Sequence, residues 1–189
     1  MIEYTVETES ITAPAVPEKA GYTGIWEAYT LDGNVTVNAI YTPITYTVTY
    51  ADALGAPNAN LTEFTVESES ITLTDLVMEG YRFDGWFDAN GERVTAIEAG
   101  SIGDLTLTAR WTKLYTVTFL CYDPTTGTLL TVDVQYLEEG ENAVAPDASE
   151  IVPEGYTFKE WNGSFENVTE DRVITAILEE DGDWSESLN

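Results

Sequence analysis

The chemically reactive side chains of this sequence are mostly carboxylates. There are 34 Asp and Glu residues against 7 Lys and Arg, which gives a formal net charge of −27, and there is no histidine. Without histidine, the chain cannot form a Ser-His-Asp or Cys-His catalytic arrangement or a His-rich zinc site. Carboxylate pairs can support glycoside hydrolysis, but the acids here are so numerous that no single pair stands out. We therefore expect no enzyme, no catalytic residues and no metal site.

Motifs for cofactors and nucleophiles are missing from the sequence as well. It has neither the G-x-x-x-x-G-K-[ST] phosphate loop nor the G-x-G-x-x-G dinucleotide loop, so no cofactor is expected. The segment "EEDGDW" (179–184) has only a weak likeness to a calcium-binding loop. Cys121, the single cysteine, lies in "VTFLCYD". We expect it to be a buried small hydrophobe, because no histidine is present to activate it.

The net charge restricts the partners of the chain. A strongly negative field repels phosphate backbones and anionic lipid headgroups, and nucleic-acid binding requires cations that displace counterions. No stretch is long and apolar enough to span a membrane. We expect no nucleic-acid partner and no membrane insertion, and we interpret most of the acids as solvated surface.

Three copies of one pattern organise the chain. Residues 3–11, "EYTVETESI", match residues 63–71, "EFTVESESI", at seven of nine positions. A Gly-Tyr motif with a following Trp occurs three times, as "GYTGIW" (21–26), "GYRFDGW" (80–86) and "GYTFKEW" (155–161). Each copy closes alike, in "NVTVNAIY" (34–41), "DLTLTARW" (104–111) and "DRVITAIL" (171–178), with Ala39, Ala109 and Ala176 at one equivalent position.

The copies divide the chain into a first unit (1–43), a second (44–113), a third (114–178) and an acidic tail or linker (179–189). The second and third copies also open alike, with "TYTVTY" (45–50) and "LYTVTF" (114–119). The first unit has no counterpart of this opening strand. Either the chain was cut inside a repeat or another strand completes the unit, and we favour the cut.

The coarse secondary structure is mostly strand. β-branched and aromatic residues alternate with Thr or acid in "YTVTY", "EFTVES", "YTVTFL", "LLTVDVQY" and "DLTLTARW". Asn90-Gly91 predicts a hairpin turn, and Asp32-Gly33 lies in a similar place. "LTDLVMEG" and "PDASEIVPEG" are the best candidates for one short helix per unit. The predicted fold class is mostly β, with tandem small β units, grasp-like or sandwich-like, that short connectors hold in an elongated array.

These residues carry a resemblance to a known family. The order Y-T-V-T-F, then Gly-Tyr-x-Phe-x-x-Trp, then D-x-T-L-T-A-x-W resembles the Listeria-Bacteroides repeat, the internalin-type B repeat found in tandem in bacterial cell-surface proteins. The middle copy fits best; the first has Gly24-Ile25-Trp26, one residue short, and the third has Glu160 in place of the glycine and Leu178 in place of the last aromatic. The resemblance implies small β-rich units at the bacterial cell surface or secreted, which act as spacers or interaction modules without catalytic activity.

The aromatic residues fall into two groups. Those that recur at equivalent positions are predicted to be structural anchors, because a small unit depends on a few large buried side chains. They are Tyr22, Trp26, Tyr81, Phe83, Trp86, Trp111, Tyr156, Phe158 and Trp161. The less regular aromatics are candidates for exposed ligand contacts, namely Tyr29, Phe87, Tyr122 and Phe165.

Three functions follow from these observations. The favoured one is a non-catalytic spacer or stalk segment of an exported bacterial surface protein, which positions an adhesive or other distal domain. The second is a binding module that recognises a host or neighbouring-cell protein or glycan through loop aromatics. The third is self-association through strand edges, for example by pairing of the incomplete first unit.

Overall fold

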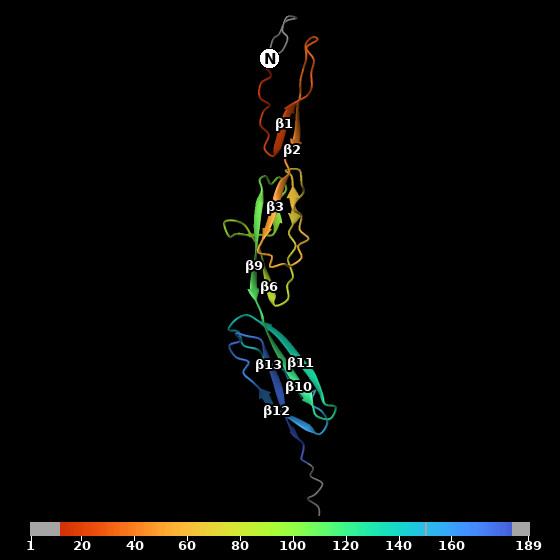
Figure 1. Ribbon diagram of the computed structural model, residues 1–189, viewed down its shortest axis with the longest axis vertical. Helices are drawn as coiled ribbons and strands as arrows, with labels where there is room; N and C mark the ends of the chain where they lie inside the picture. The colour runs from red at the N-terminus through yellow and green to blue at the C-terminus, as the bar shows by residue number, and fades with distance from the viewer. Residues whose placement is uncertain (1–11, 150, 183–189) are drawn as a thin grey trace, which may run out of the picture. The chain divides into compact units, whose positions relative to one another are not determined.

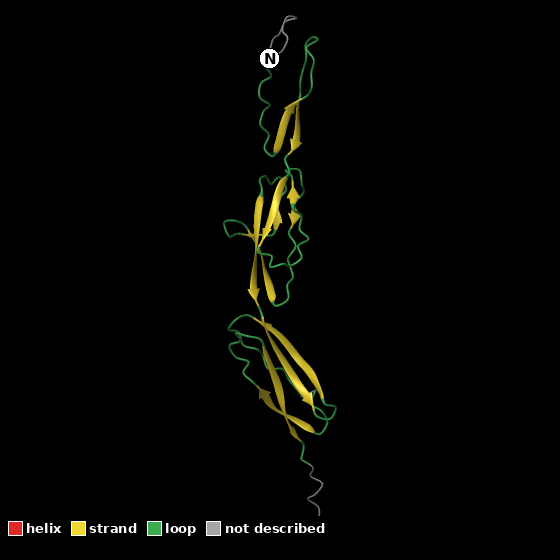
Figure 2. Cartoon of the chain, in the orientation of Figure 1, coloured by secondary structure: helices red, strands yellow, loops and turns green. Residues whose placement is uncertain are grey.

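The computed structural model describes residues 12–149 and 151–182. All regular secondary structure in these residues is β-strand, and no helix occurs among them (Figures 1 and 2). No helix in this described part is long and apolar enough to cross a membrane. Two predicted features involve residues outside this described part. They are the first copy of the nine-residue match, residues 3–11, and the end of the acidic tail, residues 183–189.

Two compact units make up the chain. The N-terminal unit reaches Asp75 and includes Gly85–Ala109, whereas the C-terminal unit consists of Leu76–Asp84 and the chain from Arg110 onward. The boundary between the two units does not coincide with the boundaries of the sequence repeats. The C-terminal unit contains parts of the middle repeat as well as the third repeat.

The first repeat contains one antiparallel hairpin, formed by β1 (Tyr22–Trp26) and β2 (Ala39–Pro43). Its register runs from Tyr22↔Pro43 to Trp26↔Ala39. Asp32-Gly33 lies in the long loop between these strands and not in a tight turn. The closing motif of the first copy starts at residue 34, but its strand begins only at Ala39, because residues 35–38 have no ladder partner among the described residues.

The middle repeat contains a mixed sheet with the strand order β4-β3-β9-β6-β7. The opening strand β3 pairs in parallel with the closing strand β9, and β6 and β7 form the hairpin predicted from Asn90-Gly91. A separate pair joins β5 to β8. The bounds are β3 Tyr46–Ala51, β4 Glu63–Phe64, β5 Ile71–Thr72, β6 Tyr81–Phe87, β7 Arg93–Val94, β8 Ala96–Ile97 and β9 Leu105–Lys113.

The third repeat contains a four-stranded sheet with the order β11-β10-β13-β12. Its opening and closing strands, β10 and β13, are again the parallel central pair, and antiparallel strands flank them. This mixed order in a single sheet favours the grasp-like alternative over two packed sheets. The bounds are β10 Tyr115–Asp123, β11 Thr128–Leu137, β12 Tyr156–Asn162 and β13 Arg172–Glu180. β13 thus extends two residues past the predicted end of the unit at 178.

Alternation along the opening strand produces the core of the third repeat. Val117, Phe119 and Cys121 are each 0% exposed, while the intervening Thr118 and Leu120 lie on the other face and are only half-buried. This is the pattern that a strand with one buried face requires. Ala143, Val168 and Ile174 complete the buried cluster around Phe119. The prediction that Cys121 is buried is confirmed.

Candidate functional site

The Gly-Tyr motif forms the same turn in all three repeats. Its glycine has a positive φ each time, +78° at Gly21, +77° at Gly80 and +87° at Gly155. A turn with φ above zero at its third residue favours glycine there, because other residues meet steric hindrance. In each turn the tyrosine N–H donates to the carbonyl three residues earlier: Tyr22 to Lys19 (3.0 Å), Tyr81 to Met78 (3.2 Å) and Tyr156 to Pro153 (3.2 Å).

The tryptophan of each motif holds the segment that precedes the turn. In each repeat the indole Nε1–H donates to a backbone carbonyl of that segment: Trp26 to Pro14 (2.7 Å), Trp86 to Thr74 (3.1 Å) and Trp161 to Pro146 (3.2 Å). Trp86 is 1% exposed, whereas the other two are half-buried. The predicted short helices are absent from the corresponding segments, 73–80 and the described part of 146–155. Each segment instead runs extended enough to present a carbonyl to the indole.

The turn glycine also ties down the residue that follows each closing strand. Its carbonyl accepts the N–H of that residue at 2.8 Å in every repeat, from Ile44 to Gly21, from Leu114 to Gly80 and from Asp181 to Gly155. Only Ile44 and Thr45 separate β2 from β3, and only Leu114 separates β9 from β10. The connectors between repeats are therefore short, and each has a backbone hydrogen bond to the preceding repeat.

A side chain adds a second restraint where the first repeat joins the middle one. The Tyr22 hydroxyl donates to Glu67 Oε1 at 2.8 Å, and this hydrogen bond raises the pKa of Tyr22 above its ordinary value. Gly21 lies so close to the middle repeat that a Cβ there would be 2.7 Å from Val66 Cβ. Both contacts lie within the N-terminal unit. The close approach to Val66 and the positive φ together require glycine at position 21.

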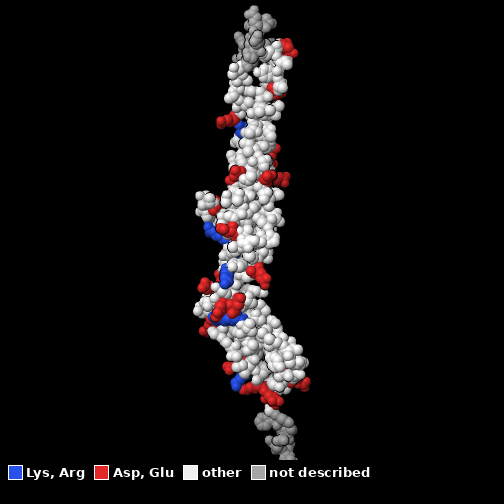
Figure 3. All heavy atoms as spheres, in the orientation of Figure 1, with Lys and Arg blue, Asp and Glu red and all other residues white. Residues whose placement is uncertain are grey.

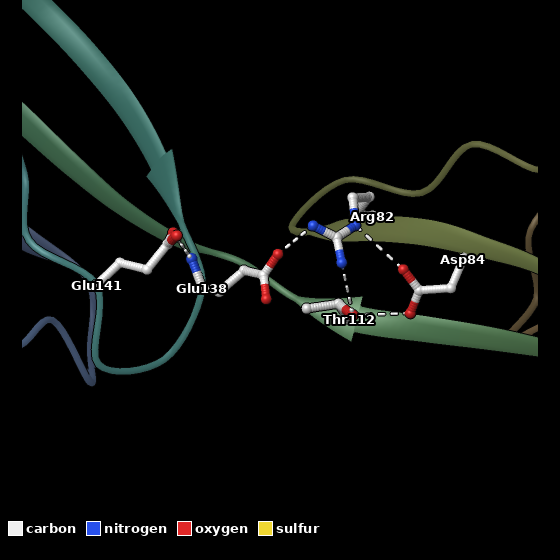
Figure 4. Close-up of polar contacts among 5 residues, drawn as sticks. All are labelled: Arg82, Asp84, Thr112, Glu138 and Glu141. Atoms are coloured by element: carbon white, nitrogen blue, oxygen red, sulfur yellow. Dashed lines mark hydrogen bonds and ion pairs between the residues drawn. The ribbon is translucent and has the colours of Figure 1, made fainter.

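An arginine, one position after the tyrosine of the motif, adds a restraint where the middle repeat joins the third (Figure 4). Arg82 Nη1 forms an ion pair with Glu138, which directly follows β11. Arg82 Nε lies 3.1 Å from Asp84 Oδ1, and Nη2 donates to Thr112 Oγ1 at 3.3 Å. Thr112 in turn donates to Asp84 Oδ2 at 2.7 Å, and the Glu138 N–H donates to Glu141 Oε2 at 2.8 Å.

This polar network lies entirely within the C-terminal unit, and the hydrogen bonds to Asp84 and Glu138 raise the pKa of Arg82. Both glutamates follow the second strand of the next repeat, β4 or β11, but the register makes Thr65, and not Glu67, the equivalent of Glu138. Tyr22 and Arg82 both lie at the start of the strand after the Gly-Tyr turn. Each junction thus has one side chain of the preceding repeat on a glutamate of the following repeat.

Most of the remaining predicted anchors lie in aromatic pairs. In the C-terminal unit, the Trp111 ring lies 4.9 Å from Phe83 and 6.4 Å from Tyr81, edge to face, and Phe158 lies 5.3 Å from Trp161. These rings are half-buried, as is Tyr156. Such edge-to-face pairs add to the stabilisation that burial alone provides.

The four predicted contact residues differ in their surroundings. Tyr122 on β10 is 52% exposed, whereas Tyr29 and Phe87 are half-buried. Phe165 packs against the core of the third repeat, with its ring 6.1 Å from that of Phe119. Phe165 therefore contributes to a core, and we withdraw it as a surface contact. Its isolation from the repeat pattern was no guide to its exposure.

Sequence reasoning missed the residues that fix the strands at the repeat ends. Asp104 Oδ1 accepts the N–H of Thr47 at 2.8 Å, and Asp171 Oδ1 accepts the N–H of Thr116 at 2.8 Å. Each aspartate directly precedes a closing strand. The signal was present in "GDLTL" and "EDRVI", where an aspartate has the same place in two copies. Glu67 and Glu138 had no such signal among so many acids.

Reactive groups elsewhere are few. Burial raises the pKa of the Cys121 thiol, with Asp123 a smaller cause, which makes the thiolate less available. Hydrogen bonds from Thr125 and Thr126 lower the pKa of Asp123 to about 2. Within residues 12–149 and 151–182 no three metal-ligating side chains are grouped.

A hollow of about 580 Å³ lies beside β1. Lys19 Nζ lies over the Tyr22 ring there, 3.6 Å from its centroid. The residues that line the hollow are Val16, Pro17, Glu18, Lys19, Ala20, Tyr22 and Gly24.

Comparison with known families agrees with this repeating frame. The Listeria-Bacteroides repeat domain matches the chain twice, over residues 46–110 and 115–176, which is more than half of its length. The chain belongs to the Listeria-Bacteroides repeat family. The repeats of this family are typical of bacterial surface proteins. Each match begins at the opening strand, β3 or β10, and ends in the closing strand, β9 or β13. No curated protein matches the chain.

Proposed function

We propose that this chain is a non-catalytic spacer in an exported bacterial surface protein, which holds a distal adhesive or other domain away from the cell. The restrained junctions are the observation that carries this proposal. Each connector is one or two residues long, and its N–H is bonded to the glycine of the preceding turn. A side chain, Tyr22 or Arg82, adds a bond to a glutamate of the next repeat.

The physical basis is the limit on motion between successive repeats. Domains joined by flexible linkers move freely unless their junction is restrained, and a freely jointed chain would not keep a distal domain at a distance. The surface charge acts in the same direction, because like charges on neighbouring repeats repel one another. On the face drawn in Figure 3, carboxylates recur over the described part of the chain, with few cations among them.

Small-angle scattering on the whole chain tests the proposal. We expect the profile of an extended particle whose largest dimension changes little between low and high salt, since short connectors and hydrogen bonds remain in both. A compact globular profile would contradict the spacer function.

A pair of insertions makes this test specific to the junction. A flexible Gly-Ser insert between Lys113 and Leu114 breaks the short connector and should broaden the distance distribution. The same insert between Asp32 and Gly33, in the loop of the first hairpin, lengthens the chain equally without touching a junction. Equal effects of the two inserts would mean that the connectors restrain nothing.

A binding module for a host protein or glycan is the second candidate. It is supported by Tyr122, which is exposed beside its register partner Leu129, itself 56% exposed. Stacking of an aromatic ring on a sugar or on an apolar side chain would use such a surface. A protein and glycan array probed with the wild type and Tyr122→Ala separates the candidates, since a spacer gives no signal that depends on Tyr122.

A further inference from the structure

The opening strand has the same partner and the same register in both complete repeats. In the middle repeat β3 pairs in parallel with the first four residues of β9, from Val48↔Leu105 to Ala51↔Thr108. In the third repeat β10 pairs in parallel with the first four residues of β13, from Val117↔Arg172 to Leu120↔Thr175. In both complete repeats, the first half of the closing strand is therefore the pairing site of the opening strand.

An aspartate sets this register. The carboxylates of Asp104 and Asp171 accept the N–H of the second residue of the opening strand, Thr47 or Thr116, at 2.8 Å. Asp104 also accepts the Thr47 hydroxyl at 3.1 Å. Because each aspartate directly precedes the closing strand, this contact fixes where the opening strand begins along its neighbour.

The first repeat has residues equivalent to the half of the closing strand that pairs with the opening strand. Aligned on Ala39 and Ala109, the residues equivalent to Asp104 and to the paired residues 105–108 are Asn34 and 35–38, "VTVN". We call Asn34–Asn38 the acceptor segment. Its valines alternate with Thr and Asn as a half-buried strand requires. Asn34 supplies a side-chain oxygen where the other repeats have a carboxylate.

In the part of the chain that the structure describes, the acceptor segment lacks the partner that its equivalents have. Among the described residues, no strand pairs with residues 35–38, and they are not in strand conformation. Val35 is 39% exposed, and Val37 is only half-buried. The residues at the Val37 position in the other repeats, Leu107 and Ile174, are each 1% exposed. The missing neighbour is thus a strand that would bury this side chain.

The backbone of the segment is engaged on one side. The Asn38 carbonyl accepts the N–H of Glu27, and the Asn38 N–H donates to Glu27 Oε1 at 2.9 Å. Both groups of Asn38 therefore face the chain that continues β1. Since successive residues of a strand present their backbone groups to opposite sides, an extended Val37 directs its own groups to the other edge.

We propose that the acceptor segment binds an extended peptide segment with the pattern of the opening strands, Tyr-Thr-Val-Thr followed by an aromatic residue. The segment adds in parallel beside residues 35–38, as a strand added to an exposed sheet edge. In the register of the other repeats, its valine lies beside Val35 and its aromatic residue covers Val37, and the N–H of its first threonine donates to Asn34 Oδ1. This inference goes beyond the spacer proposal and does not depend on it.

Hydrogen-exchange mass spectrometry on the whole chain with a synthetic peptide tests the inference. The peptide has the sequence "TYTVTYAD", residues 45–52. We expect the amides of residues 35–38 to exchange more slowly when peptide is added in excess. A scrambled peptide of the same composition should have no effect. No slowing with excess peptide, or slowing elsewhere but not in the acceptor segment, would overturn the proposal.

Variants of the acceptor segment link any protection to the contacts described. Asn34→Ala should weaken binding roughly 2–10-fold, the range for one lost hydrogen bond, whereas Asn34→Asp, which introduces the residue of the other repeats, should retain it. Val37→Lys should abolish binding, and Ile25→Ala, at an exposed position of β1, is the matched control. If Asn34→Ala and Val37→Lys both bind the peptide as tightly as the wild type does, the assigned register is refuted.

Sedimentation velocity without peptide tests the main competing occupant. We expect a monomer over the concentration range, because the opening strands of a second copy are already paired in their own sheets. A concentration-dependent dimer that Val37→Lys abolishes would mean that a second copy fills the edge. The proposal of a separate peptide segment would then be wrong.

Discussion

Replacement of Trp86 by alanine gives the most direct test of the anchor role of the Gly-Tyr-Trp motif. Trp86 is 1% exposed, its ring lies 4.8 Å from that of Tyr50, and its indole N–H donates to the Thr74 carbonyl. The substitution removes the whole ring, leaves a cavity beside Tyr50 and releases the segment that contains Thr74. All of these contacts lie within the N-terminal unit.

The expected loss is comparable to the stability of the repeat. Truncation of a buried Trp or Phe to Ala costs about 3–5 kcal/mol. A domain the length of residues 46–110 has a free energy of unfolding of ~3–10 kcal/mol at ordinary values per residue. The free energy of unfolding that remains is therefore between a value below zero and about 7 kcal/mol. We expect the middle repeat to be largely unfolded or to unfold at much lower urea concentration.

Hydrogen-exchange mass spectrometry can measure this effect repeat by repeat. In Trp86→Ala, peptides from 46–75 and 85–109 should lose protection, while peptides from 115–149 keep most of theirs. Repeat proteins lose stability mainly at the altered repeat and its interfaces, which is why a local readout is needed. Urea unfolding followed by far-UV circular dichroism should show a transition of reduced amplitude or lower midpoint.

Two further variants separate ring volume from the hydrogen bond. Trp86→Phe keeps an aromatic ring but loses the N–H, so it should cost less than Trp86→Ala by the difference in buried volume. Trp26→Ala changes the equivalent but half-buried residue of the first repeat and should leave 46–110 protected. If Trp86→Ala retains wild-type protection in 46–110 and an unchanged urea midpoint, the anchor role is wrong and the motif returns to candidacy as a binding surface.

Three other measurements follow from the side-chain environments. Because the pKa of Asp123 is lowered to about 2, its stabilising contribution is present above its unfolded value of about 4 and is lost as pH falls from there toward 2; carboxyl NMR titration should report the low pKa, and Asp123→Asn should flatten that part of the stability profile. The buried Cys121 thiol should resist alkylation at neutral pH until denaturant is added, and rapid alkylation of the native chain would contradict its burial. A double-mutant cycle of Arg82→Ala and Glu138→Ala in urea should give a small favourable coupling that weakens with salt, since both side chains are partly exposed, and no coupling at low salt would remove this pair from the junction argument.

The strands were predictable because their alternation is local. β3, β9, β10 and β11 were all anticipated from Thr or acid alternating with apolar residues, and this pattern suffices to define one buried face. "EFTVES" is the exception, since only Glu63–Phe64 form a strand there. The two short helices were left open because a short apolar segment does not distinguish a helix from an extended chain. The indole bonds to Thr74 and Pro146 decided in favour of the extended form.

The candidate site was only half predictable for a related reason. Recurrence identified the glycine, tyrosine and tryptophan of each motif, but their partners at the turns are backbone carbonyls, which any residue type supplies. The glutamates at the junctions were hidden by the abundance of acid. Phe165 was assigned to the surface because it breaks the repeat pattern, yet it packs on Phe119.

By itself, the sequence determined the three copies, the mostly β fold class and the likeness to the Listeria-Bacteroides repeat, since all three depend on residue types at fixed spacing. Only the tertiary structure decided the parallel pairing of opening and closing strands, the carbonyl that each tryptophan holds and the contacts of Tyr22 and Arg82 at the junctions. It also revealed that, within residues 12–149 and 151–182, no strand pairs with residues 35–38 as one pairs with their equivalents. The physical reason is that such contacts join residues far apart in the chain through backbone groups and common surface acids, for which spacing and composition carry no signal.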